Sequence, residues 1–162
     1  MTLIQIGEKA PDFDLPALIG GVRQRWRLSE HRGQNIVLAF YPFNWEAATT
    51  DQFTRYQVER EELLACDAEI IGISVDSIMN TTAWEREIGP FDFPLCSDFW
   101  PHGEVCSCYG VFRSEAPARG AGDRAIFIVD KTGSVAFGKV YGLHDQPDIG
   151  EIFEWLRALR AA

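Results

Sequence analysis

The chain has 162 residues, of which 46% are hydrophobic and 12% aromatic, enough apolar material for one packed core of ordinary domain size. We therefore expect a single domain spanning residues 1–162. Lys and Arg number 15 against 24 Asp and Glu, a formal charge of −9, which argues against a surface built to neutralise phosphates. We expect neither a nucleic acid nor a membrane partner.

The sequence carries no run of about eighteen apolar residues. Its first residues also lack the basic, apolar and small-residue pattern of a signal peptide, so we expect a cytoplasmic protein. The four cysteines are too few for a disulfide scaffold in a chain of this length, and in a reducing compartment they should rest as thiols. They are Cys66, Cys96, Cys106 and Cys108.

The first predicted element is a buried central strand at 34–41, a nearly continuous apolar run between a His-Arg-Gly turn signal and Pro42. Residues 47–66 place apolar side chains close to helical spacing among charges, which is typical of the crossover helix of a βαβ unit. A second buried strand follows at 69–76.

Shorter helical patterns occupy 80–88 and 103–109, and a Gly- and Ala-rich surface loop spans 114–123. A third buried strand at 124–130 pairs with 134–141 as a hairpin, before an amphipathic helix at 147–159. This alternation of strands and helices predicts an α/β sandwich.

Six segments, in this order, resemble the peroxiredoxins of the alkyl hydroperoxide reductase and thiol-specific antioxidant family, in particular the PrxQ and AhpE-like branches. They are GEKAPDFDL (7–15), VLAFYP (37–42), GISVD (72–76), FPLCSD (93–98), YGVF (109–112) and RAIFIVDKTG (124–133). The resemblance covers nearly the whole chain. It implies a thioredoxin-like fold with a central mixed sheet flanked by helices, and a thiol-dependent peroxidase ancestry.

The chemistry of that family resides in a Pro-x-x-x-Thr-x-x-Cys motif, where the first long strand runs into a helix. A thiol in the first helical turn gains from the helix dipole, and a nearby Arg favours the thiolate further. By this resemblance Pro42 is retained and Arg124 matches the family arginine, but Glu46 stands at the Thr position and Thr49 at the peroxidatic Cys position. Gln52 stands where the family often has Glu.

A hydroxyl cannot be oxidised to a sulfenic acid, so we do not expect ordinary peroxide reduction at Thr49. A threonine nucleophile would need an activating base, and no Ser/His or Thr/N-terminal arrangement is visible. If the family fold holds, Glu46 and Arg124 should approach each other as a charge-assisted pair that replaces the thiolate and arginine. The alternative is that Glu46 points to solvent and favours the helix N-terminus through the dipole.

Cys106 and Cys108 form a Cys-Ser-Cys element in the region where some family members carry a resolving cysteine. In a regular helix their side chains point roughly 200° apart, so a disulfide would require local unwinding. Packing is the alternative for both thiols, as it is for Cys66 and Cys96. Cys106, Cys108 and His102 match no closed zinc spacing, so we expect no metal and no cofactor.

Two functions therefore stay open. The first is a family oxidoreductase in which Cys106 or Cys108 supports residual thiol redox chemistry with a thioredoxin-like reductant. The second is a non-catalytic binding or regulatory protein in which Glu46, Thr49 and Arg124 line a polar pocket for a small ligand or a partner. The second has more physical support, because no thiol occupies the activated position. We expect a monomer or a homodimer.

Overall fold

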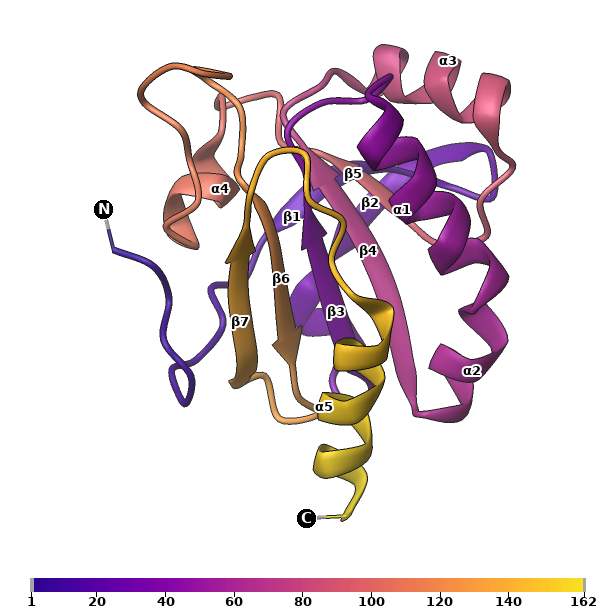
Figure 1. Cartoon of the computed structure of the whole chain (residues 1–162), viewed down its shortest axis with the longest axis vertical. Helices are drawn as coiled ribbons and strands as arrows, with labels where there is room; N and C mark the ends of the chain where they lie inside the picture. Colours follow the sequence, from indigo (N-terminus) through magenta and orange to yellow (C-terminus); the bar gives the residue numbers. More distant parts are fainter. Residues whose placement is uncertain (1, 162) are drawn as a thin grey trace.

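Seven strands form one mixed sheet in the order β2-β1-β5-β4-β3-β6-β7, in a computed structural model that describes residues 2–161 (Figure 1). The strands are β1 (Asp14–Ile19), β2 (Val22–Arg27), β3 (Asn35–Phe40), β4 (Ala68–Ser74), β5 (Leu95–Ser97), β6 (Arg124–Val129) and β7 (Val135–Tyr141). The helices are η1 (Leu28–His31, a 3₁₀ turn), α1 (Ala47–Val58), α2 (Arg60–Ala65), α3 (Ile78–Ile88), α4 (Glu104–Cys108) and α5 (Ile149–Ala161).

The centre of the sheet consists of the apolar runs predicted as strands. β3 is buried along its whole length and pairs in parallel with β4 and antiparallel with β6. A strand covered on both faces needs apolar side chains throughout, which explains why these runs do not alternate with polar residues. The prediction of a central mixed sheet flanked by helices is confirmed.

Each face of the sheet has its own hydrophobic core. One core packs the sheet against α1, α2, α3 and α5, through side chains such as Phe53, Leu63, Trp84 and Phe153. The other packs it against α4 and the N-terminal segment, with Val105 and Tyr109 among its members. Figure 1 shows α1 and α5 together in front of the sheet.

The predicted helix at 47–66 is two helices, α1 and α2, separated at Glu59. Glu59 has φ −93° and ψ 8°, outside the helical range, although its N–H still bonds to the carbonyl of Arg55. The break changes the direction of the chain, so that Tyr56 before it and Leu63 after it are both buried in the same core.

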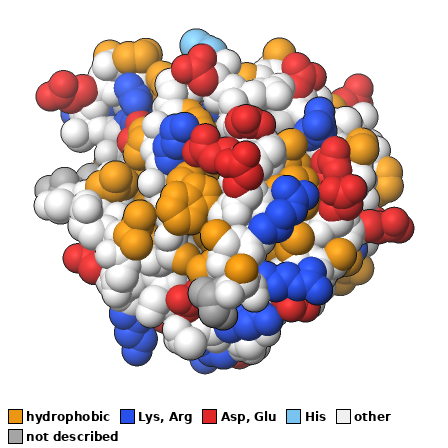
Figure 2. Space-filling model, turned by 60° about the horizontal axis from the view of Figure 1, so that its bottom comes forward, with side chains coloured by type: hydrophobic (Ala, Val, Ile, Leu, Met, Phe, Trp, Pro, Cys, Tyr) orange, Lys and Arg blue, Asp and Glu red, His pale blue; other side chains and the backbone are white. Residues whose placement is uncertain are grey.

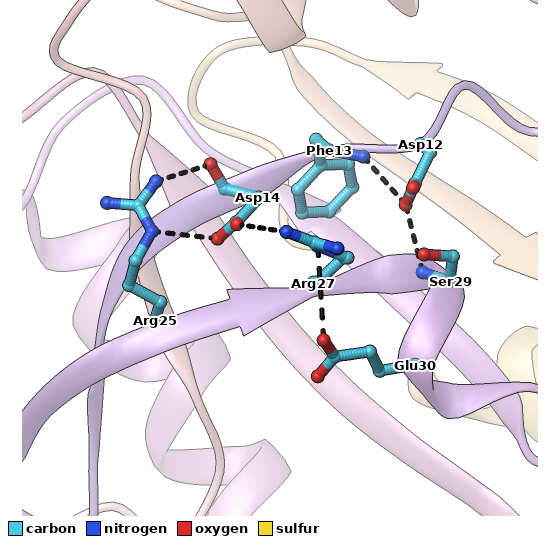
Figure 3. A network of polar contacts seen from close by, with 7 residues as sticks. All are labelled: Asp12, Phe13, Asp14, Arg25, Arg27, Ser29 and Glu30. Atoms are coloured by element: carbon cyan, nitrogen blue, oxygen red, sulfur yellow. Dashed lines mark hydrogen bonds and ion pairs between the residues drawn. The ribbon is translucent and has the colours of Figure 1, made fainter.

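The hairpin of β1 and β2 is absent from the predicted elements. Its outer strand is an edge strand with the sequence VRQRWR, in which only Trp26 is buried, so it lacks an apolar run. Polar contacts hold it instead (Figure 3): Asp14 binds both Arg25 and Arg27 at 2.9 Å across the hairpin. Charged side chains of this kind also protect a sheet edge from pairing with other strands.

Candidate functional site

Arg124, the first residue of β6, lies at the centre of the candidate site with its side chain fully buried. Its Nη1 donates to Gln52 Oε1 at 2.8 Å and to Thr49 Oγ1 at 3.1 Å. Its Nε donates to the carbonyl oxygen of Leu143 at 2.9 Å. Three fixed acceptors therefore hold the guanidinium plane against the first turns of α1.

Thr49 and Gln52 meet Arg124 together because they lie three residues apart on the buried face of α1. Glu46 is the N-cap residue of this helix, one turn before Thr49, and its carbonyl accepts a hydrogen bond from Thr50 N–H at 3.0 Å. The i, i+3 spacing of 46, 49 and 52 thus directs three polar side chains from one helix end toward a single arginine.

Glu46 Oε1 lies 3.7 Å from Arg124 Nη2, so the structure brings the two charged groups together. The contact is a single ion pair rather than a bidentate one, because Nη1 is already bonded to Thr49 and Gln52. Within residues 2–161, neither Glu46 Oε1 nor Arg124 Nη2 has a hydrogen-bond partner, and both atoms are buried. Burial lowers the pKa of Arg124, and the charge of Glu46 opposes that shift.

Gln52 links the arginine to a second buried group. Its Nε2 donates to the hydroxyl oxygen of Tyr56 at 2.7 Å, while its Oε1 accepts from Arg124. Burial raises the pKa of Tyr56, so this hydroxyl stays protonated. The sequence shows Gln52 only as a departure from the family pattern; its spacing from Thr49 is the signal that places it in the site.

The loop between β3 and α1 is fixed to α3 by polar contacts. Pro42 is buried, and the N–H of Asn44 donates to Asp76 Oδ2 at 2.8 Å. Trp45 adopts the left-handed conformation with φ 72°, and its Nε1 donates to Asn80 Oδ1 at 3.0 Å. The indole remains 53% exposed beside the start of α1. This anchoring determines where the helix begins, and with it the position of Glu46.

The cysteines lie apart from this arrangement, and all four are free thiols. On α4, Cys106 is buried whereas Cys108 is exposed, as expected for an i, i+2 pair in a helix. Burial and the neighbouring carboxylate of Asp98 raise the pKa of Cys106, and burial together with Glu104 raises the pKa of Cys108. Both shifts lower the thiolate fraction at neutral pH, which is the opposite of an activated cysteine.

Neither a metal centre nor a membrane-spanning helix is found within residues 2–161. In this part of the chain, no three His, Cys, Asp or Glu side chains gather in a group suited to a metal ion. Nor does this range contain a helix that is both long and apolar enough to cross a bilayer.

Comparison with known proteins adds the family. The model of the AhpC/TSA family matches residues 6–137. The chain belongs to the AhpC/TSA family, the peroxiredoxins. It is 32% identical to alkyl hydroperoxide reductase E of Mycobacterium tuberculosis over 98% of both chains. It is also 29% identical to peroxiredoxin-2 of Mus musculus, over 97% of this chain and 78% of the relative.

Solved structures show the same peroxiredoxin architecture. Mycobacterium tuberculosis AhpC superposes with a TM-score of 0.88 at 26% identity, covering 99% of this chain and 95% of that one. Reduced 2-Cys peroxiredoxin of Plasmodium vivax superposes with a TM-score of 0.88 at 22% identity, covering 96% and 82%, a likeness of fold. The thioredoxin-like fold of the peroxiredoxin type is therefore confirmed.

Proposed function

We propose that this peroxiredoxin-family protein is a non-catalytic binding protein that uses the former peroxide pocket. In this proposal Thr49 stands at the position of the peroxidatic cysteine and Glu46 at that of the family threonine, while Pro42 and Arg124 are retained. The observation that carries the proposal is the hydrogen bond from Arg124 Nη1 to Thr49 Oγ1, 3.1 Å long. The guanidinium that would stabilise a thiolate contacts a hydroxyl instead.

Thr49 cannot take over the chemistry of a thiol. Peroxide reduction transfers an oxygen atom to sulfur, and a hydroxyl oxygen has no corresponding oxidised state. The carboxylate of Glu46 adds a negative charge close to the same guanidinium, 3.7 Å from Nη2. Like-charge repulsion would raise the pKa of any acid generated there. Both replacements therefore act in the same direction, away from peroxidase activity.

Two buried atoms that face each other as an ion pair at 3.7 Å, without a hydrogen bond, indicate what the pocket would hold. Arg124 Nη2 is a buried donor and Glu46 Oε1 a buried acceptor, without hydrogen-bond partners within residues 2–161. Buried polar atoms without partners are rare, because each one loses its hydration without compensation. A small polar ligand with a hydroxyl group would accept from Nη2 and donate to Oε1, and so satisfy both.

Residual thiol redox chemistry at Cys106 or Cys108, recycled by a thioredoxin-like reductant, is the second candidate. The exposure of Cys108 favours it, since a partner could reach this thiol. The raised pKa of both thiols opposes it. This candidate stays a prediction, as do the cytoplasmic location and the choice between monomer and homodimer.

A stopped-flow peroxide challenge of the reduced protein tests the proposal, followed by intact mass and thiol counting. We expect peroxide consumption no faster than that of free cysteine, with the same rate in a Cys106→Ser, Cys108→Ser variant. Fast consumption with formation of a disulfide, abolished in the variant, would establish the second candidate. Fast consumption that persists in the variant would contradict both functions.

A further inference from the structure

A cavity of about 410 Å³ lies at the other end of the sheet from the candidate site. It is lined by Asn35, Cys66, Asp67, Asp130, Lys131, Thr132, Leu159 and Arg160. Asn35 is the first residue of β3, and the loop that positions Glu46 follows the last one. The six residues of this strand span roughly 20 Å, so the cavity and the candidate site are separate.

Both signs of charge line the cavity. Lys131 Nζ lies 3.1 Å from Asp67 Oδ2, which connects the β6–β7 turn to the residue before β4. Arg160, near the end of α5, donates through Nη1 to the carbonyl oxygen of Ala65 at 3.2 Å. Figure 2 shows that acidic, basic and apolar side chains intermingle on the face that includes this end of the molecule.

Asp130 presents a carboxylate that is both fixed and ionised. Its Oδ1 accepts from the N–H and hydroxyl of Thr132 and from the N–H of Ser134, at 2.9, 2.7 and 3.0 Å. Partial burial opposes ionisation, but these hydrogen bonds outweigh it and lower the pKa of Asp130. All three bonds fall on Oδ1, and among residues 2–161 Oδ2 accepts no hydrogen bond, which leaves it for a further donor.

Asn35 extends the lining of the cavity from the surface charges to a largely buried residue of the sheet. The residue is only 4% exposed, and along β3 it shares a face with Val37, which packs in the core that includes Cys66 and against which Leu159 packs. Within residues 2–161 its side-chain amide makes no hydrogen bond, although its backbone N–H bonds to Asp67 O at 2.8 Å. Its amide atoms are not among the fully buried polar atoms that lack a partner in this part of the chain, so the amide is accessible from the cavity.

We infer that this cavity binds a small zwitterion of dipeptide size. Its carboxylates suit an ammonium group, while Arg160 and Lys131 suit a carboxylate. The amide of Asn35, accessible from the cavity, can both donate and accept, as a peptide group requires. The apolar portions of Leu159 and Cys66 accommodate small side chains. The volume lies within the usual range for small-molecule sites.

Calorimetric titration of the full-length reduced protein with alanyl-alanine, N-acetyl-alanyl-alanine and alanyl-alanine amide tests this inference. The zwitterion should bind, and each blocked form should bind about tenfold more weakly, because each lacks one charge-assisted contact. Alkylation of Cys66 by iodoacetamide should slow when the dipeptide is present, since this thiol lines the cavity.

Two variants assign the contacts. Asp67→Asn keeps a side chain that tolerates φ 56° and should weaken binding of the zwitterion but not of the N-acetyl form. Arg160→Met should weaken the zwitterion but not the amide form. Asp51→Asn, an exposed change on α1, is the matched control and should leave all three affinities unchanged.

Absence of binding by alanyl-alanine at about 10 mM would overturn the inference. So would equal affinity for the three probes, or affinities that neither Asp67→Asn nor Arg160→Met changes. Far-UV circular dichroism of each variant separates a lost contact from a lost fold. Peroxide assays play no part in this test, so its failure would leave the proposed function unaffected.

Discussion

A reactive cysteine needs both a sulfur atom and a positively charged environment. In this protein the charge lies at the start of α1 and the sulfur lies on the short helix α4. At α1, a buried arginine and a helix N-terminus surround Thr49, so the electrostatics favour an anion but the side chain is a hydroxyl. At α4, two thiols are present, but Asp98 and Glu104 lie beside them and the pKa of each thiol is raised. Thiol reactivity therefore depends on combining sulfur and positive charge at one place, and neither region does so alone.

The largest effect should come from supplying sulfur where the positive charge already is. Glu46→Thr together with Thr49→Cys should consume peroxide about 10³-fold faster than free cysteine does, because the thiol pKa falls and fixed donors stabilise the transition state. Stopped-flow peroxide consumption measures the rate. A folded double variant no faster than free cysteine would mean that the pocket differs from an active one at further positions, with Gln52 the first to examine.

A single replacement should have a smaller effect. Thr49→Cys alone should react about tenfold more slowly than the double variant, because the carboxylate of Glu46 raises the pKa of the new thiol. Glu46→Gln combined with Thr49→Cys keeps the shape of the side chain, removes its charge and should recover most of the rate. Equal rates for the single and double variants would refute this electrostatic argument.

The thiols on α4 should differ from each other in native-state labelling. Under native conditions iodoacetamide should modify Cys108 first, and more slowly than it modifies free cysteine, because the pKa of Cys108 is raised. Cys106 should react only when the protein unfolds, since its side chain is fully buried. Peptide mass mapping after timed labelling reads both sites. Labelling of Cys106 before Cys108 would contradict the burial of Cys106 and the exposure of Cys108.

The smallest effect should come from the carboxylate that supports α4. Asp98 accepts hydrogen bonds from Val105 N–H and Cys106 N–H, at 3.1 and 2.9 Å. Asp98→Asn keeps one acceptor oxygen but replaces the other with an NH₂ group, so one of these two N–H groups loses its partner. This loss should cost about 1 kcal/mol in the free energy of unfolding at neutral pH, measured by urea denaturation.

The pH dependence of this variant has a definite sign. Burial raises the pKa of Asp98 above its usual value of 3.8, so the folded state holds this proton more tightly than the unfolded state does. The resulting contribution to stability is complete below the unfolded pKa and is lost as the pH rises through the folded pKa. Relative to Asp98→Asn, the wild type should therefore lose stability as the pH rises through this window. A constant difference between the two proteins across that window would contradict the shift.

Much of the fold could be predicted from apolar runs. β3, β4 and β6 are buried on both faces, so their sequences carry no competing pattern. The hairpin of β1 and β2 could not be predicted in this way, because its edge strand is held by ion pairs such as that of Asp14 with Arg25. Ion pairs across strands cannot be identified from the sequence before the register of the strands is known. The break at Glu59 likewise depends on packing against the sheet.

The candidate site also has a part that could be predicted from the sequence and a part that could not. Glu46 and Thr49 follow from a linear motif at one helix end, and Arg124 follows from the resemblance of the segment at 124–133 to the family. The contacts to Gln52 and to the carbonyl of Leu143 depend on how α1 and the segment after β7 close around Arg124. Backbone carbonyls carry no sequence signal, so that part of the site required the structure.

The central claim is that, apart from the carboxylate of Glu46, the start of α1 retains the environment of an activated thiol and lacks the sulfur. The most direct measurement is the pKa of the thiol installed by Thr49→Cys in the Glu46→Thr background, from thiolate absorbance as a function of pH, with Arg124→Met added as the control. We predict a pKa well below the value of about 8.5 for free cysteine, returning toward that value in the control. A pKa at or above about 8.5 with Arg124 in place would contradict the claim.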